Sequence, residues 1–342
     1  MEDNKNMDVY EILSRYGYAD GEIDKIINDK SSFGYDVNKL GTIIDNSYTY
    51  LSNKGYTYEE IKKMALSFPG VLSTSNGKRK IIEDVFLGLG MSFLEFKRIS
   101  LKCVNIFSYS EERICSYINF FRNVGYLDKD IIKIFKIVPL IFRVSINNLE
   151  KFCNEMISYG FTKEEIFKIG KNFPSFWSHN FNKVNIIIDT FIVLGFSKEE
   201  VKKIIMLSPS LIGYNKETIL EKFEDIMMLG FTREELMGVI RIYPTILSAD
   251  VNRTREILDF FTKIGLREKI LNDPKSFFMQ GIESSYAKYY FYMDNDVEIN
   301  DNTYRRLFLD WKRFENKYGI GKEELLEKYS YDEDMKNIVK KK

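Results

Sequence analysis

The sequence predicts an all-α protein, an α-solenoid of about seven 35-residue helix–turn–helix repeats with a helical C-terminal cap. Three observations predict this fold: a glycine recurs every 35 residues, a proline follows it at a fixed distance, and a helix-capping pair stands just after it. A strict period in this range is typical of stacked repeats, because no single unit can bury its own apolar face. The glycines are Gly55, Gly90, Gly125, Gly160, Gly195, Gly230 and Gly265.

Positions within a repeat are counted from its glycine, which is position 0. Proline stands at position 14 in five of the six full repeats, and Val104 replaces it in the repeat that begins at Gly90. Proline lacks a backbone N–H and pushes the preceding residue out of the helical region, so it ends the first helix. The apolar residues behind it predict a short buried turn before a second helix. The prolines are Pro69, Pro139, Pro174, Pro209 and Pro244, and the sixth of the chain, Pro274, lies in a shortened last repeat.

A capping box opens the first helix of most repeats. Thr or Ser stands at position 2 and Glu at position 5 in five of the six repeats. The hydroxyl accepts a hydrogen bond from the first turn, and the carboxylate accepts one from the N–H of the capping residue. The second helix is expected to end at the next glycine, in the left-handed conformation. The pairs are Thr57 and Glu60, Ser92 and Glu95, Thr162 and Glu165, Ser197 and Glu200, and Thr232 and Glu235.

The repeats divide the chain into three segments. Residues 55–264 hold six regular repeats, and residues 1–54 are expected to form a degenerate N-terminal capping repeat in which 31–34 replace the proline turn. Terminal repeats diverge because one of their faces meets water. Residues 265–342 are expected to hold a shortened repeat, a helical cap with helices over 283–293, over 302–317 and from Gly319 on, and a basic tail at 340–342.

Composition and charge exclude several classes of protein. The hydrophobic content of 44% is enough for a continuous core, and no apolar run approaches the ~20 residues that a membrane helix needs. The net charge is zero, with −4 in residues 1–54 and +4 in residues 55–264, so the basic bias of the repeats is weak. The first residues resemble neither a secretory signal nor a transit peptide, which favours a cytosol-like compartment, with an organelle as the alternative.

No motif in the sequence indicates an enzyme. The chain has no GxGxxG, P-loop, CxxC or HExxH pattern, and its single histidine, His179, has no catalytic pattern around it. The three cysteines are irregularly spaced, which indicates reduced thiols and neither disulfides nor a metal site. Trp177 falls at an apolar position of the repeat and is expected in the core. We therefore expect no catalytic residues, no cofactor and no metal.

Residues 194–201 (LGFSKEEV) and 204–212 (IIMLSPSLI), followed by a long helix, resemble the repeats of the mitochondrial transcription termination factor (mTERF) family. The resemblance covers roughly residues 55–275 in consecutive units. It implies a right-curved solenoid of paired helices, joined by short 3₁₀ turns, with a groove that can hold a duplex. Known members bind DNA or RNA and affect transcription, replication or ribosome assembly. Their contacts are scattered along the groove, so no residue transfers by motif.

Two columns of basic residues are candidates for phosphate contacts, because stacking would align them along the array. The first column, at position 8, also fits a second interpretation. Glu59, Glu164 and Glu199 lie four residues earlier, and such pairs stabilise solvated helix faces. The first column is Lys63, Arg98, Lys133, Lys168 and Lys203.

The second column, at position 23, opens the second helix. It has no regular acidic partner, and positive charge near a helix start opposes the helix dipole, so its repetition suggests a use elsewhere. Lys136, Lys171 and Arg241, late in the first helix, are further candidates. The second column is Lys78, Arg113, Lys183 and Arg253.

The sequence thus predicts a nucleic-acid-binding helical-repeat protein. It would hold double-stranded DNA or structured RNA in a curved basic groove and regulate transcription or other gene expression. It is expected to be a monomer without membrane association. The alternative is an α-solenoid scaffold that binds protein partners through the same surface.

Overall fold

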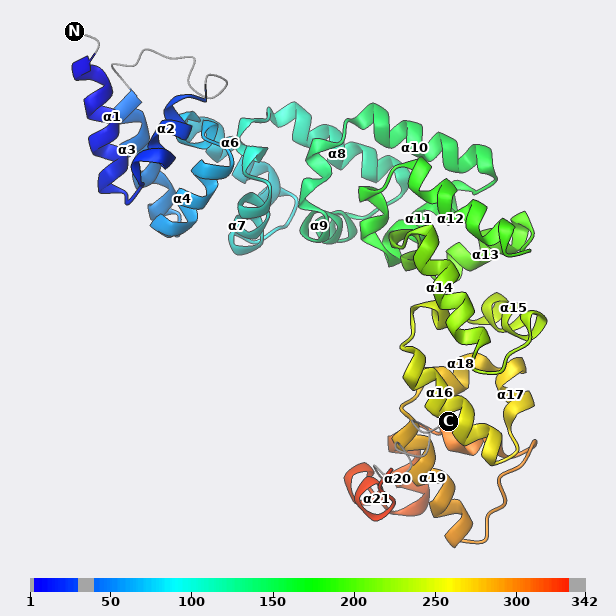
Figure 1. Cartoon of the computed structure of the whole chain (residues 1–342). Helices are drawn as coiled ribbons and strands as arrows, with labels where there is room; N and C mark the ends of the chain where they lie inside the picture. Colours follow the sequence, from blue (N-terminus) through cyan, green and yellow to red (C-terminus); the bar gives the residue numbers. More distant parts are fainter. Residues whose placement is uncertain (1–2, 30–39, 332–342) are drawn as a thin grey trace. The chain divides into compact units, whose positions relative to one another are not determined.

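The computed structural model describes residues 3–29 and 40–331, and every regular element in these ranges is a helix. The chain forms two compact units, Met1–Phe181 (unit 1) and Asn182–Lys342 (unit 2). Figure 1 shows unit 1 in blue to green and unit 2 in green to red. None of the helices in the described ranges is both long and apolar enough to pass through a membrane.

Unit 1 begins with α1 (Asp3–Arg15), α2 (Asp20–Ile27) and α3 (Leu40–Asn53). In its regular repeats, α4, α7 and α9 lie along one edge of the unit, and α6, α8 and α10 lie along the other (Figure 1). The repeat elements are α4 (Tyr58–Ser67), α5 (Gly70–Ser73), α6 (Asn76–Gly88), α7 (Phe93–Lys102), the 3₁₀ helix η2 (Val104–Ser108), α8 (Glu111–Val124), α9 (Asp128–Ile137), η3 (Pro139–Arg143), α10 (Ile146–Tyr159), α11 (Lys163–Asn172) and η4 (Pro174–Ser178).

Unit 2 continues the same alternation and then changes toward the C-terminus. Its repeat elements are α12 (Phe181–Val193), α13 (Lys198–Leu207), η5 (Pro209–Gly213), α14 (Lys216–Met227), α15 (Arg233–Ile242), η6 (Pro244–Ser248) and α16 (Val251–Lys263). The C-terminal part comprises α17 (Arg267–Asn272), α18 (Pro274–Met279), α19 (Ile282–Asp294), η7 (Tyr304–Phe308), α20 (Trp311–Tyr318) and α21 (Lys322–Lys328).

The first helices of the six full repeats bury the same three positions. Positions 6, 9 and 10 are buried in α4, α7, α9, α11, α13 and α15; in α9 they are Ile131, Ile134 and Phe135. This spacing of three and one places them on one stripe of the helix, which faces the core. Positions 4, 8 and 12 are not part of this stripe and face outward. In each unit, we call the outward surface of these helices the first-helix face of that unit.

The predicted capping boxes are present. In α4 the N–H of Glu60 donates to Thr57 Oγ1 at 3.1 Å, and the N–H of Thr57 donates to Glu60 Oε2 at 2.8 Å. The same reciprocal pair opens α7, α11, α13 and α15. Each box satisfies two N–H groups that the helix cannot satisfy itself, and the loss of such a cap costs about 1 kcal/mol.

The series glycines end the second helices as expected. All of them have positive φ, and Gly125, which follows α8, has a φ of 111°. Its N–H donates to the carbonyl of Arg122 at 2.9 Å. A side chain is strained in this left-handed region, so the glycine lets the chain reverse direction between repeats.

Trp177 lies in the core of unit 1, as predicted, with 1% of its surface exposed. Its ring packs edge-on against Phe120 and Phe121, with centroids 5.8 and 5.2 Å away. The indole also explains a glycine within a helix: a Cβ on Gly170 would lie 2.4 Å from Trp177 Nε1. Gly170 on α11, which has no side chain, therefore leaves room for the large side chain of Trp177 on η4.

The C-terminal part departs from the regular repeat. Pro274 begins α18 and leaves α17 only six residues. The helix expected over 283–293 is α19, and α21 follows the expected opening at Gly319. The single helix expected over 302–317 is wrong: it is divided into η7 and α20, because Asp310 has extended backbone and caps α20, accepting from the N–H of Arg313 at 3.0 Å. Residues 31–34 and the basic tail at 340–342 lie outside the described residues.

The two kinds of glycine respond differently to a methyl group. Gly125→Ala is expected to destabilise the protein by about 1 kcal/mol or more, because φ is positive there. An added Cβ would meet Phe167 only at an ordinary 3.7 Å, so the loss would come from the backbone. Gly238, inside α15, has no heavy atom within 4 Å of that position, and Gly238→Ala is expected to stabilise by about 0.5–1 kcal/mol. Thermal unfolding followed by circular dichroism compares them, and a loss of stability in both variants would contradict this account.

Candidate nucleic-acid interface

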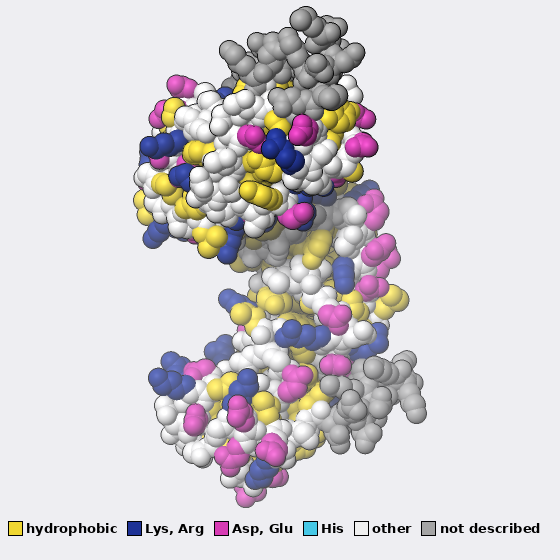
Figure 2. Space-filling model, turned by 90° about the vertical axis from the view of Figure 1, so that its left-hand side faces the viewer, with side chains coloured by type: hydrophobic (Ala, Val, Ile, Leu, Met, Phe, Trp, Pro, Cys, Tyr) yellow, Lys and Arg dark blue, Asp and Glu magenta, His cyan; other side chains and the backbone are white. Residues whose placement is uncertain are grey.

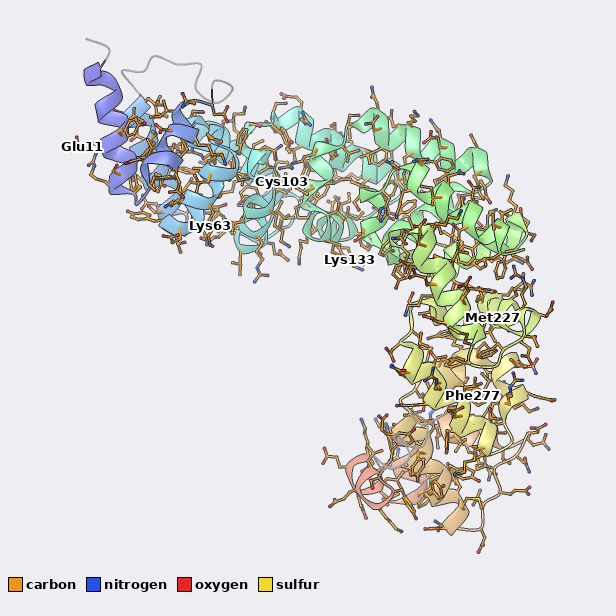
Figure 3. All side chains as sticks on the ribbon, viewed as in Figure 1. Glu11, Lys63, Cys103, Lys133, Met227 and Phe277 are labelled. Carbon is orange, nitrogen blue, oxygen red and sulfur yellow. The ribbon has the colours of Figure 1, made fainter. Side chains whose placement is uncertain are left out.

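The column at position 8 is exposed on the first-helix faces. Its bases lie on α4, α7, α9, α11 and α13, and Figure 3 shows Lys63 and Lys133 on the same edge of unit 1. None of the five forms a hydrogen bond, or an ion pair within 4 Å, with a residue that the structure describes. They are Lys63, Arg98, Lys133, Lys168 and Lys203.

The alternative interpretation of position 8 is a helix-stabilising pair with a glutamate four residues earlier. These ion pairs do not form between the residues that the structure describes. No ion pair within 4 Å joins Glu59 to Lys63 in the described chain, and Glu199 instead lies 3.9 Å from Lys202. The pKa of Glu164 is lowered chiefly by a hydrogen bond from its own backbone N–H, with Lys168 a minor contributor. The position-8 bases therefore remain available for an external anion.

The second column ties neighbouring repeats together. Three of its bases donate to a backbone carbonyl at the end of the turn in the next repeat, and Lys183 is half-buried. The Arg113 guanidinium also lies 4.0 Å from the centroid of the Tyr109 ring. The bonds join Lys78 Nζ to Ser108 O at 2.6 Å, Arg113 Nη2 to Phe142 O at 3.0 Å and Arg253 Nη2 to Gln280 O at 3.2 Å.

These bonds give the repeated charge at the start of the second helix a structural use. A cation there satisfies a carbonyl that the short turn leaves free, which offsets the unfavourable helix dipole. Sequence reasoning missed this use because a backbone carbonyl has no sequence signature. Nucleic-acid contact by the second column stays a prediction. The bonds between repeats are a second, structural explanation for the same bases.

Lys136, Lys171 and Arg241 also have partners in a neighbouring repeat. Each pairs with the acid at position 5 of the preceding repeat; Glu95 and Glu200 also cap their helices, and Asp130 does not. The pairs join Lys136 to Glu95 at 2.5 Å, Lys171 to Asp130 at 3.4 Å and Arg241 to Glu200 at 2.6 Å.

Other junctions use a base from a different position for the same purpose. Lys62 pairs with Glu22 and Lys97 with Glu60, each at 2.8 Å. At the last junction Arg267 pairs with Glu235 at 2.8 Å. We call this series the ion-pair ladder. Apart from Asp130, its acids cap a helix and hold the next repeat at the same time. A role of Lys136, Lys171 or Arg241 in nucleic-acid binding would require these bases to leave their acids or to share them.

A signal for the ladder was present in the sequence and was not used. Positions 7 and 11 are complementary: each full repeat has one base and one apolar residue there, in either order. Both positions point toward the preceding repeat, so either can supply the cation. The pairs at positions 7 and 11 are Lys62 and Leu66, Lys97 and Leu101, Ile132 and Lys136, Phe167 and Lys171, Lys202 and Met206, and Met237 and Arg241.

The outward bases of α7 and α9 form the most basic part of the first-helix face of unit 1. The two helices pack against each other, and their acids are all engaged. Glu95 and Asp130 are in the ladder, and Asp128 pairs with Arg122 at 2.9 Å. Position 4, which is glutamate in four of the six repeats, is Leu94 or Lys129 here.

Four exposed bases on these helices are left without an acidic partner among the described residues: Arg98, Lys102, Lys129 and Lys133. We call them the α7–α9 basic patch. Lys102 and Lys129 were not identified from the sequence. The missing glutamate at position 4 of two successive repeats was the available signal.

The face shown in Figure 2 carries basic and acidic side chains mixed with hydrophobic ones, without a continuous field of one sign. This agrees with the zero net charge of the chain. Among the described residues, no group of three or more His, Cys, Asp or Glu side chains could hold a metal ion. The exposed positive charge is therefore local. It depends on which neighbouring acids are already engaged in the ion-pair ladder.

The ladder makes stability depend on acid pH. Hydrogen bonding from Arg267 and from the N–H of Thr232 lowers the pKa of Glu235 to about 2. Because this pKa is depressed in the folded state, the stabilisation is present above the ordinary glutamate pKa and is lost as the pH falls toward 2. Glu235→Gln should keep the cap, lose the ion pair and lower the melting temperature at pH 7 by about 2–4 °C, the shift that ~1 kcal/mol produces in a domain of this size.

Melting curves recorded from pH 7 to pH 2 should show the variant and the parent protein converging at the acid end. Glu234→Gln is the matched control, because Glu234 is exposed and has no ion pair in the described chain. A constant difference between Glu235→Gln and the parent at every pH would contradict the assigned role of the carboxylate.

The mTERF family model matches residues 78–192 and 178–272, which together span more than half of the chain. No curated protein matches the sequence. The paired helices joined by 3₁₀ turns agree with mTERF repeats and confirm the predicted all-α fold class. The chain therefore belongs to the mTERF family and is a non-enzymatic, nucleic-acid-binding helical-repeat protein.

Proposed function

We propose that the protein binds double-stranded DNA or structured RNA through the α7–α9 basic patch of unit 1, and that this binding regulates transcription or another step of gene expression. One observation carries the proposal. On α7 and α9 every acid is engaged in an ion pair, while Arg98, Lys102, Lys129 and Lys133 are exposed without one among the described residues.

The arrangement of these four bases suits phosphates. Arg98 and Lys102 lie one turn apart on α7, and Lys129 and Lys133 lie one turn apart on α9, so each pair projects from one side of its helix. Neighbouring helices pack about 8–10 Å apart, so two parallel rows of charge face outward. Such rows follow a backbone and carry little sequence information, which favours modest sequence preference.

The small number of bases in the α7–α9 basic patch sets the expected salt dependence of binding. Four phosphate contacts would give a slope of about −3.6 in a plot of log K against log salt for duplex DNA. Affinity should therefore fall steeply between low and physiological salt. The remaining position-8 bases of unit 1, Lys63 and Lys168, would add to the slope if the polymer reaches them.

The decisive variant changes Arg98, Lys102, Lys129 and Lys133 to Gln. We expect at least a tenfold loss of affinity for labelled duplex DNA or structured RNA at low salt, and a slope nearer zero, by fluorescence anisotropy. The matched control changes Lys80, Lys151, Lys216 and Lys263 to Gln, four exposed bases on second helices. It removes the same total charge and should bind almost as the parent does. Equal losses in both variants would show that only net charge matters, and undiminished binding by the first would refute the proposed patch.

A second variant separates the two columns. Changing Lys78, Arg113, Lys183 and Arg253 to Gln removes bonds between repeats, so we expect a lower melting temperature with little change in affinity. The measurement pairs a thermal melt with the anisotropy titration well below the melting temperature. A large loss of affinity without a loss of stability would instead assign this column to the polymer.

A further inference from the structure

We infer that the first-helix face of unit 2, together with the adjoining helix α18, docks an acidic amphipathic helix of a partner protein across α13, α15 and α18. This inference goes beyond nucleic-acid binding and does not depend on the α7–α9 basic patch. It stands on a groove, a glycine and two bases, all of them within unit 2.

The groove has a volume of about 260 Å³ and a largely apolar lining. Three large side chains from three helices border it, and they are 57%, 47% and 61% exposed: Leu207, Ile242 and Met279. Clustered apolar side chains that remain exposed in a folded chain mark interaction sites. The lining residues are Leu207, Ile242, Tyr243, Pro244, Thr245, Lys275 and Met279.

Gly238 stands one turn before Ile242 on the outward side of α15. The other five full repeats have Lys or Arg at this position. Neither packing nor backbone conformation requires the glycine, since its φ is not positive and a Cβ would meet no heavy atom within 4 Å. Glycine inside a helix costs about 1 kcal/mol relative to alanine, and its one local advantage is that another chain can approach the helix backbone closely.

The rim of the groove is positive. Lys203 lies one turn before Leu207, and Lys275 lines the groove; both are exposed and make no ion pair within the described chain. Arg241 is neutralised by Glu200. The exposed acids Glu199 and Glu234 lie at the other end of their helices, eight residues and therefore about 12 Å from the apolar side chains. An occupant with acidic flanks complements this rim.

Spacing favours a helix as the occupant. The anchors come from neighbouring helices, which pack about 8–10 Å apart. Residues seven apart in an α-helix lie on one face and are separated by about 10.5 Å, whereas same-face residues of a strand repeat about every 6.7 Å. A helix with apolar residues at i, i+7 and i+14 therefore matches the groove. Nucleic acid fits less well, because the base of position 8 is missing in α15 and the surface is apolar.

The probe is a labelled 22-residue helical peptide with Leu at i, i+7 and i+14 flanked by Glu. One comparison peptide has Ser in place of Leu, and another has Lys in place of Glu. Anisotropy titrations with the full chain should give a dissociation constant below about 100 µM for the first peptide and at least tenfold weaker binding for the other two. Failure of the acidic peptide to bind, or equal binding of all three, overturns the inference.

Variants locate the site. Leu207→Ser/Ile242→Ser/Met279→Ser and, separately, Gly238→Gln should each weaken the acidic peptide at least tenfold. Gly238→Gln adds a good helix former, so an unchanged or higher melting temperature rules out misfolding as the cause. The matched control is Ile186→Ser/Val193→Ser/Met228→Ser, which alters two exposed apolar residues on α12 and one that directly follows α14 in the same unit, and it should bind as the parent does.

Two further readouts separate this inference from the proposed function. The variant of the α7–α9 basic patch should bind the peptide as the parent does, even if it loses nucleic acid. If Gly238→Gln or the triple groove variant weakens nucleic acid and leaves the peptide unaffected, the surface belongs to the nucleic-acid site and the inference is overturned. Equal weakening by the control triple variant overturns it as well.

Discussion

A 35-residue repeat of two short helices cannot bury its own apolar side chains, and this constraint assigns a task to most positions of the first helix. Positions 6, 9 and 10 enter the core, position 5 caps the helix in five of the six full repeats, and position 7 or 11 supplies a cation to the position-5 acid of the preceding repeat. Position 8 has none of these tasks. Stacking does not explain a base at this position, such as Arg98 or Lys133. Such bases are therefore candidates for nucleic-acid binding.

The two units use the same positions for different surface chemistry. In unit 1 the acids of α7 and α9 are engaged in ion pairs, so the neighbouring bases are left to face solvent. In unit 2, α15 has Gly238 at position 8 in place of the base that Lys203 supplies on α13, and the exposed apolar side chains of Leu207 and Ile242 project at position 12. A repeat protein can vary its exposed positions without disturbing its stacking, so one array can serve a polyanion and a protein partner through different repeats.

The fold was predictable because its determinants lie close together in the sequence. A capping box spans four residues, a glycine with positive φ ends a helix locally, and a proline stops one locally. The break between η7 and α20 was missed because Asp310 has the same composition cues inside a helix as at its start. The candidate site was predicted in outline: position 8 was identified as a column, but the α7–α9 basic patch was not, since Lys102 and Lys129 matter only once the neighbouring acids are known to be engaged.

The sequence by itself determined the period, the paired helices of the regular repeats and the family, since all of these follow from local spacing repeated along the chain. Only the tertiary structure decided which cations are free. Arg113 bonds a carbonyl 29 residues away, and Lys136 pairs with an acid 41 residues away, in the neighbouring repeat. The availability of a base depends on the nearest acceptor in space. The distance in space between a base and its nearest acceptor cannot be read from their separation in the sequence. Stacking brings remote residues together and leaves sequence neighbours on different faces.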